Sequence, residues 1–170
     1  MTPLEEVLSG RDERAAWQKK MLAAREGAFV CQIGLNVPGF PKRVPGDIKI
    51  VKECRRFLLA CVGAAPFEEH YLDNGAGLCW QGAFDGRKFD ARAMKDAAVE
   101  AENSMEAGRI LDIDVLTSEG QLSRLDMGLP PRRCLVCGES AKACARAGKH
   151  DPAELREIVM RIIKTAAAGR

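Results

Sequence analysis

The pattern with the clearest chemical potential is a pair of aspartates, Asp112 and Asp114, separated by one isoleucine within an apolar run. In an extended strand alternate side chains share a face, so the two carboxylates are expected on one side, with Cα atoms about 6.5–7 Å apart. Two carboxylates this close repel each other unless a cation bridges them or one is protonated. Mg²⁺ is the expected cation, because it prefers oxygen ligands and shares them with substrate phosphates. The alternative is two solvated aspartates on an edge strand, although aspartate is depleted in strands.

A second candidate metal site is a group of three cysteines and a histidine, Cys134, Cys137, Cys144 and His150, with the spacing C-x2-C-x6-C-x5-H. Three thiolates and an imidazole suit a tetrahedral structural zinc ion, which would give order to an otherwise irregular segment. The six-residue spacing is short for a zinc finger. Reduced, unligated cysteines and a redox-active C-x2-C pair therefore remain alternatives.

Basic residues near both sites suit the binding of phosphate. A loop with two prolines and a glycine follows Asn36 and leads to Lys42, which would meet a phosphate as a point charge. Arg132 or Arg133 would bind a phosphate bidentately. Residues 124–150 contain six basic and two acidic side chains, a charge of +4, so the remainder sums to −2 for a net charge of +2. This local excess indicates phosphates or an acidic partner rather than nucleic acid, with a plain solvated loop as the alternative.

The spacing of apolar residues predicts the elements that position these groups. Between residues 28 and 117 the expected order is strand, helix, strand, strand, helix, strand. This is the βαββαβ order of ferredoxin-like folds, so we expect an α+β core with a mixed or antiparallel sheet and helices on one face. Flanking N- and C-terminal helices should pack outside this core. The first and last strands would be neighbours, which brings the Pro-Gly loop towards the aspartates.

Composition is typical of a globular protein and predicts a single domain over residues 1–170. Hydrophobic residues make up 46% and charged residues 29% of the chain. Residues 118–150 are expected to form an irregular, Cys-rich basic loop. No run of about 18 apolar residues is present and the first fourteen residues are polar, which argues against a membrane span and a signal peptide and favours the cytoplasm. Four further cysteines in apolar surroundings are expected to be reduced core residues: Cys31, Cys54, Cys61 and Cys79.

Several blocks together resemble the citrate lyase holo-[acyl-carrier protein] synthase family. They are SGRDER at 9–14, NVPG at 36–39 with Lys42, GRILDIDV at 108–115, LSR at 122–124 and LPPRRCLVCG at 129–138, followed by Cys144 and His150. The resemblance runs from about residue 8 to residue 155, and the block at 129–138 is its most specific part. Leu111 stands where an aromatic residue is common, and residues 67–73 match poorly.

The resemblance implies a nucleotidyltransferase-like enzyme, an apo-citrate lyase phosphoribosyl-dephospho-CoA transferase. Such an enzyme joins the phosphoribosyl end of 2′-(5″-triphosphoribosyl)-3′-dephospho-CoA to a serine of the citrate lyase acyl-carrier (gamma) subunit and releases pyrophosphate. Asp112 and Asp114 would be the catalytic, Mg²⁺-binding pair, by similarity to malonate decarboxylase holo-carrier synthases. The residues expected to bind the donor are Asn36, Gly39, Lys42, Arg109, Arg124, Arg132 and Arg133. A non-catalytic, zinc-stabilised protein-binding module and the same chemistry on another carrier protein are the alternatives.

Overall fold

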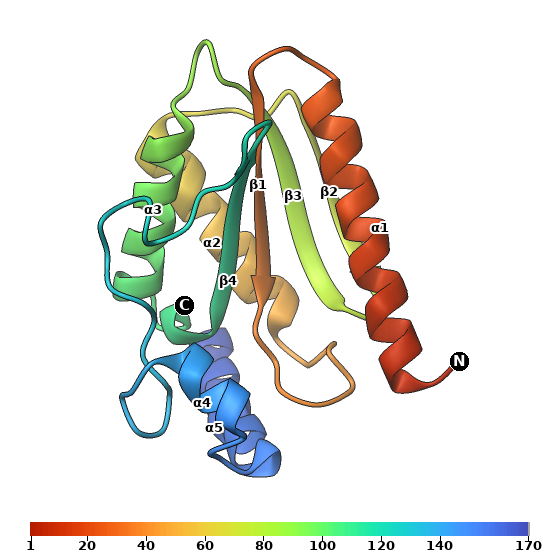
Figure 1. Ribbon diagram of the computed structural model, residues 1–170, viewed down its shortest axis with the longest axis vertical. Helices are drawn as coiled ribbons and strands as arrows, with labels where there is room; N and C mark the ends of the chain where they lie inside the picture. The colour runs from red at the N-terminus through yellow and green to blue at the C-terminus, as the bar shows by residue number, and fades with distance from the viewer. Residues whose placement is uncertain (170) are drawn as a thin grey trace.

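The computed structural model describes residues 1–169, and its centre is a five-stranded antiparallel sheet with the order β2-β3-β1-β4-β5 (Figure 1). The strands are β1 (Ala28–Leu35), β2 (Glu68–Asn74), β3 (Gly77–Asp85), β4 (Leu111–Thr117) and β5 (Gly120–Gln121). The element order from β1 to β4 is the one that the apolar spacing predicts, and the sheet is antiparallel, one of the two expected arrangements. β1 pairs with β4, so the loop that leaves β1 lies beside the start of the strand that carries the aspartates.

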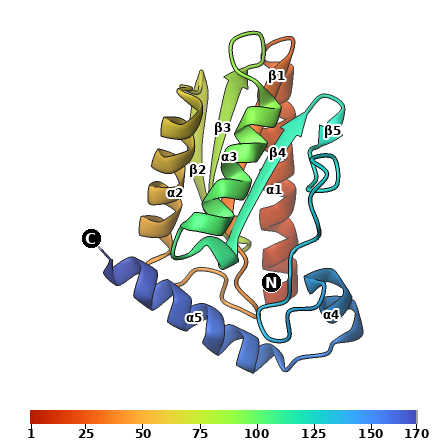
Figure 2. The ribbon, with the colours of Figure 1, turned by 90° about the vertical axis from the view of Figure 1, so that its left-hand side faces the viewer.

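Helices cover both faces of the sheet, although the sequence predicted only one covered face. α2 (Asp47–Val62) and α3 (Ala91–Ser104) lie side by side on the first face (Figure 2). α1 (Pro3–Ala23) crosses β1, β2 and β3 on the other face (Figure 1). Its contacts with the sheet combine polar pairs, such as the hydrogen bond from Gln18 to Gln32 (2.9 Å), with the packing of Met21 against Val30 and Ala83. α1 has no apolar stripe that would have revealed this packing.

The main core lies between the sheet and the pair α2 and α3. The side chains of Leu111, Ile113 and Val115 are buried on this face of β4. Phe29 of β1 and Phe84 of β3 stack with ring centroids 5.1 Å apart. Aromatic pairs of this kind contribute about 0.5–1.5 kcal/mol beyond the area that they bury. The strand that carries the aspartates is therefore fixed from its other face.

The C-terminal third contains more regular structure than the sequence predicted. Residues 118–150 include β5 and the short helix α4 (Ala141–Ala147), and α5 (Pro152–Ala168) closes the chain and packs against α2. A short 3₁₀ turn, η1 (Gly108–Ile110), precedes β4. α1 begins at Pro3, directly after Thr2, because Thr2 and Glu5 form a capping box.

The cysteines of the core are mostly placed as predicted. Cys31, Cys54 and Cys79 are buried free thiols. The prediction was wrong for Cys61, which is exposed near the end of α2. Apolar neighbours in sequence did not reveal that this position faces solvent. None of the helices within residues 1–169 is both long and apolar enough to cross a membrane.

Candidate functional site

Asp112 and Asp114 lie on one face of β4, opposite the buried side chains of that strand. Asp112 is exposed and Asp114 is partly buried. The pKa of Asp114 is raised to about 6, first by burial and then by the negative charge of Asp112, while Lys95 and Arg132 act in the opposite direction. The two carboxylates thus carry negative charge that their surroundings only partly compensate, which suits the binding of a cation.

The neighbouring strand leaves space above Asp112. Gly34 of β1 lies directly opposite Asp112, and Gln32 lies opposite Asp114. Gln32 is buried and accepts a hydrogen bond from Gln81 (2.7 Å). The absence of a side chain at Gly34 therefore opens the sheet surface beside Asp112, whereas the surface beside Asp114 is filled.

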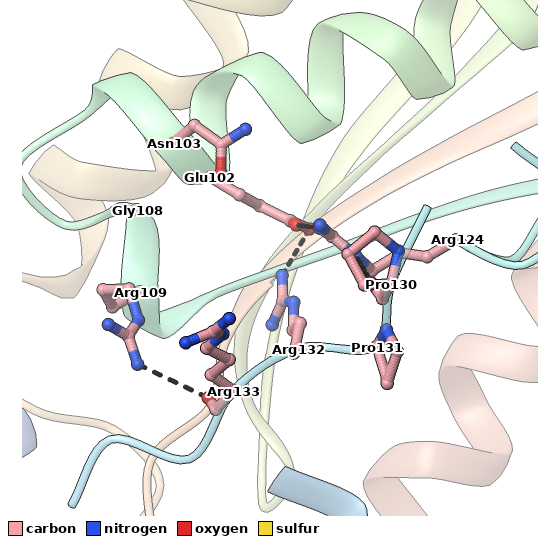
Figure 3. Close-up of a pocket in the computed structure, with 9 residues that line it drawn as sticks. All are labelled: Glu102, Asn103, Gly108, Arg109, Arg124, Pro130, Pro131, Arg132 and Arg133. Atoms are coloured by element: carbon pink, nitrogen blue, oxygen red, sulfur yellow. Dashed lines mark hydrogen bonds and ion pairs between the residues drawn. The ribbon is translucent and has the colours of Figure 1, made fainter. Parts of the chain in front are cut away.

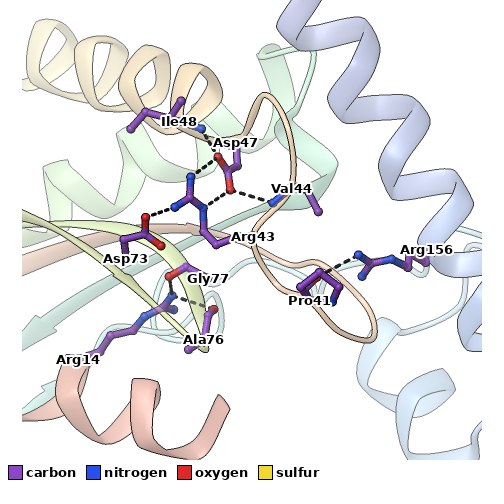
Figure 4. Close-up of polar contacts among 10 residues, drawn as sticks. All are labelled: Arg14, Pro41, Arg43, Val44, Asp47, Ile48, Asp73, Ala76, Gly77 and Arg156. Atoms are coloured by element: carbon purple, nitrogen blue, oxygen red, sulfur yellow. Dashed lines mark hydrogen bonds and ion pairs between the residues drawn. The ribbon is translucent and has the colours of Figure 1, made fainter. Parts of the chain in front are cut away.

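Arg14 of α1 projects into this space, and the sequence predictions did not include it. Its Nη2 atom donates to the carbonyl oxygens of Ala76 (2.8 Å) and Gly77 (2.9 Å) (Figure 4). Its Nη1 atom lies 3.9 Å from the position that a Cβ atom on Gly34 would occupy. The Nε atom is buried and has no hydrogen-bond partner among the described residues. The only signal in the sequence was the block at residues 9–14, which contains Arg14.

The Pro-Gly loop between β1 and α2 lies at the same end of the sheet. The amide of Asn36 donates to the carbonyl of Ile110 (2.8 Å), directly before β4. Asn36 and Gly39 are exposed. Arg156 of α5 fastens the loop by donating to the carbonyl oxygens of Pro38 and Pro41 (Figure 4). The loop is thus held in place beside Asp112.

Three further contacts fix the C-terminal half of this loop. Arg43 forms ion pairs with Asp47 (2.7 Å) and with Asp73. The carboxylate of Asp47 also accepts from the amide of Val44 (3.1 Å). Arg43 is therefore engaged by two carboxylates, whereas Lys42 forms no ion pair with a described acidic residue.

Lys42 is part of a concentration of positive charge. Its Nζ atom donates to the carbonyl of Val37 (2.7 Å), and its backbone lies against Gly77, where Arg14 is also bound. The pKa of Lys42 is lowered by burial and by the nearby charges of Arg11 and Arg156. A bound phosphate group would relieve this repulsion.

The four predicted arginines gather at the outer edge of β4, around a cavity of about 260 Å³ (Figure 3). Arg124 (2.7 Å) and Arg132 form ion pairs with the buried carboxylate of Glu102. Arg132 also donates to the carbonyl of Leu111 (2.6 Å). These contacts hold the loop after β5 against the sheet, and they place the Arg132 charge near Asp114.

Arg109 and Arg133 complete the cavity. Arg109 donates to the carbonyl of Cys134 (3.2 Å). Arg133 is exposed. Three of the four arginines thus hold the loop in place, and Arg133 is the one that is presented to solvent. Of the basic groups described here, Arg132 acts on Asp114, and Arg14 lies beside Gly34, the residue of β1 opposite Asp112.

The cysteine cluster is assembled by the fold as the spacing predicted. The candidate ligand atoms of Cys134, Cys137, Cys144 and His150 all lie within 4.8 Å of one another, so the cluster could hold a metal ion. The pKa of Cys134 is lowered to about 6 by hydrogen bonds from the backbone amides of Cys137 and Val136. Burial raises the pKa of Cys144. This group lies apart from the aspartates but directly follows Arg132 and Arg133 in the chain.

Comparison with known proteins identifies the family. A family model described as apo-citrate lyase phosphoribosyl-dephospho-CoA transferase matches residues 2–166. Proteins with that name from Shigella flexneri serotype 5b and Escherichia coli O1:K1 are 36% identical over 160 residues, which is 89% of this chain and 83% of each relative. Protein CitXG of Haemophilus influenzae is 33% identical over 162 residues, which cover 94% of this chain but 34% of that protein. The chain is a transferase, and it belongs to the apo-citrate lyase phosphoribosyl-dephospho-CoA transferase family.

Proposed function

We propose that this transferase moves the phosphoribosyl-dephospho-CoA group from 2′-(5″-triphosphoribosyl)-3′-dephospho-CoA to a serine of the citrate lyase acyl-carrier (gamma) subunit, with release of pyrophosphate. The observation that carries the proposal is the aspartate pair on β4, with Arg132 near Asp114 and Arg14 beside Gly34, opposite Asp112. A triphosphate donor brings several negative charges. At such a site a metal ion and basic side chains together offset these charges.

Asp112 and Asp114 fit a Mg²⁺ ion and are proposed to hold it. The support is chemical: both groups offer hard oxygen ligands, and the pKa of Asp114 is raised first by burial and then by the negative charge of Asp112, which a bound cation would offset. When bound, the ion offsets charge on the phosphate oxygens of the donor. Within the protein, Gly34 leaves room beside Asp112 for the donor.

The proposed step is an in-line displacement at the α-phosphorus. The Oγ atom of the carrier serine forms the new P–O bond and loses its proton to solvent, while the bond to the bridging oxygen breaks and pyrophosphate leaves. Arg14, Lys42 and Arg133 are the basic side chains proposed to offset the charge on the departing group. Arg109, Arg124 and Arg132 are proposed to bind the donor. Their contacts with the protein also hold the loop after β5 in place.

The proposed architecture is a single nucleotidyltransferase-like domain of residues 1–170, located in the cytoplasm. Its core is proposed to be ferredoxin-like, because the helices α2 and α3 connect strands whose order is β2-β3-β1-β4. Membership of a transferase family leaves no basis for a purely non-catalytic module. The same chemistry on another carrier protein is the alternative that the experiment must exclude.

The test is a transfer assay with purified carrier proteins. The triphosphate donor and Mg²⁺ are added to the citrate lyase carrier subunit, and the mass of the carrier and the released pyrophosphate are measured. One phosphoribosyl-dephospho-CoA group per carrier is the expected result. A carrier whose acceptor serine is replaced by alanine should gain no mass. Transfer to an unrelated carrier at an equal or greater rate would overturn the proposed target, and no transfer to any carrier would overturn the reaction.

A further inference from the structure

The cysteine cluster lies in a segment that has almost no core of its own. Within residues 118–150 only Cys134 and Cys144 are buried. A segment of this length cannot offset the entropy cost of ordering with so little buried apolar surface. It is nevertheless folded into a small hairpin and a helix, so polar contacts such as those of Arg124 and Arg132, together with any bound ion, must supply most of its stability.

The four candidate ligands come from three separate parts of this segment. Cys134 and Cys137 flank a tight turn, Cys144 lies in α4, and His150 follows that helix. Cys137 and Cys144 have Sγ atoms 3.4 Å apart and are free thiols, although a disulfide would bring them to about 2.0 Å. Ligand atoms around a tetrahedral zinc ion lie about 3.3–3.8 Å apart, so this separation suits a shared ion.

One polar contact and one unpaired buried nitrogen indicate that the group is arranged around a cation. The amide of Val136 donates to the Sγ atom of Cys134 (3.4 Å), as is suitable for a metal-binding thiolate. The Nε2 atom of His150 is buried and has no hydrogen-bond partner within the described part of the chain. Buried polar nitrogens are nearly always paired, so this atom lacks a partner that a metal ion would supply.

The cluster is tied directly to the arginine loop. The amide of Ala141, at the start of α4, donates to the carbonyl of Arg132 (2.9 Å). The side chain of Arg132 in turn reaches the carbonyl of Leu111, next to Asp112 (2.6 Å). Arg109 donates to the carbonyl of Cys134 (3.2 Å). Whatever orders the cluster also sets the position of these arginines beside β4.

We infer that Cys134, Cys137, Cys144 and His150 bind one structural zinc ion, which folds residues 134–150 and thereby holds the arginine loop against β4. Zinc suits three thiolates and one imidazole in a closed site, where it has no open position for chemistry. The ion is separate from the Mg²⁺ proposed at the aspartates, so the inference stands whether or not the proposed reaction is correct.

The test begins with elemental analysis of the full-length protein, purified without a metal-affinity tag. We expect one zinc per chain and substoichiometric iron. Replacement of zinc by Co²⁺ should give the visible absorption of a tetrahedral thiolate site. Cys137→Ser and His150→Ala should each lose most of the zinc. Cys61→Ser is the matched control, because Cys61 is an exposed thiol outside the cluster, and it should keep one zinc.

Wild-type protein with less than about a tenth of a zinc ion per chain would overturn the inference. Stoichiometric iron would overturn it as well. Retention of full zinc in both variants would also overturn it. If a variant does not fold, the zinc content and Co²⁺ spectrum of the wild-type protein still decide the question, since neither depends on a substitution. Activity is not needed as a readout, so failure here is distinguishable from failure of the proposed transfer.

Discussion

Asp112 and Asp114 project from a strand whose other face is packed into the main core, whereas Cys134 and Cys144 are themselves the buried residues of their segment. The first pair is positioned by the sheet and needs no ligand to hold its geometry. The second group has little packing to hold it and is proposed to depend on a bound zinc ion for its order. Loss of the metal should therefore affect the two candidate sites differently. At the aspartates it should abolish activity and leave the fold intact, and at the cysteine cluster it should unfold the local segment.

The largest effect is expected for Asp112→Asn. The substitution keeps the shape of an exposed side chain and removes a charge that is proposed to bind Mg²⁺, so transfer should fall by about 10³-fold or more. The melting temperature should change by only about 1–3 °C, because the core face of β4 is untouched. Steady-state kinetics and thermal denaturation measure both.

Glu119→Gln is the matched control for that change. Glu119 is an exposed carboxylate in the turn between β4 and β5, and its replacement should leave transfer unchanged. Comparable activity in Asp112→Asn and Glu119→Gln would show that Asp112 is dispensable for the reaction.

Arg14→Ala should raise the KM for the triphosphate donor by about 10–100-fold, the loss expected for a charge-assisted contact. Arg14→Lys should recover part of this affinity, because the positive charge is kept while the two-carbonyl contact is lost. Lys19→Ala is the control on the same helix, since Lys19 is exposed. If Arg14→Ala lowers the melting temperature and leaves KM unchanged, Arg14 only attaches α1 to the sheet.

Removal of zinc should affect one region and spare the other. With a zinc-selective chelator and excess Mg²⁺, amide hydrogen exchange should accelerate within residues 122–150 and stay slow in β1, β3 and β4. Transfer should fall about tenfold, because Arg132 loses its fixed position. Equal acceleration in the sheet would mean that the two regions are not stabilised independently.

The smallest effect concerns the pH dependence of stability. The pKa of Asp114 is raised from its ordinary 3.8 to about 6, so the folded state favours the protonated form. Its stabilising contribution is present below pH 3.8 and is lost as pH rises through about 6. In Mg²⁺-free protein, Asp114→Asn should therefore increase the free energy of unfolding at pH 8 by on the order of 1–2 kcal/mol.

That gain should disappear near pH 4, where the wild-type carboxyl is protonated. Mg²⁺ should stabilise the wild-type protein more at pH 8 than at pH 5 and should not stabilise the variant. Chemical denaturation at several pH values measures this dependence, and Asp96→Asn, at an exposed position of α3, is the control. An unchanged stability of Asp114→Asn at pH 8 would mean that the charge is already compensated.

The sequence by itself determined the local features of both sites. Alternation in residues 111–115 placed both aspartates on one face of β4, and the spacing of Cys134, Cys137, Cys144 and His150 identified a cluster that the fold assembles. The order of strands and helices from β1 to β4 also followed from apolar periodicity, because that signal is local. The block LPPRRCLVCG at residues 129–138 indicated the family that the comparisons identify.

Only the tertiary structure decided which distant groups surround the aspartates. Arg14 is 98 positions before Asp112 in the chain and lies beside Gly34, the residue of β1 opposite Asp112, because α1 packs on the second face of the sheet. Arg124 and Arg132 are engaged by Glu102, a buried carboxylate that no local pattern connects to them. Contacts of this kind depend on how helices and loops pack, and a polar interface leaves no periodic trace in the sequence.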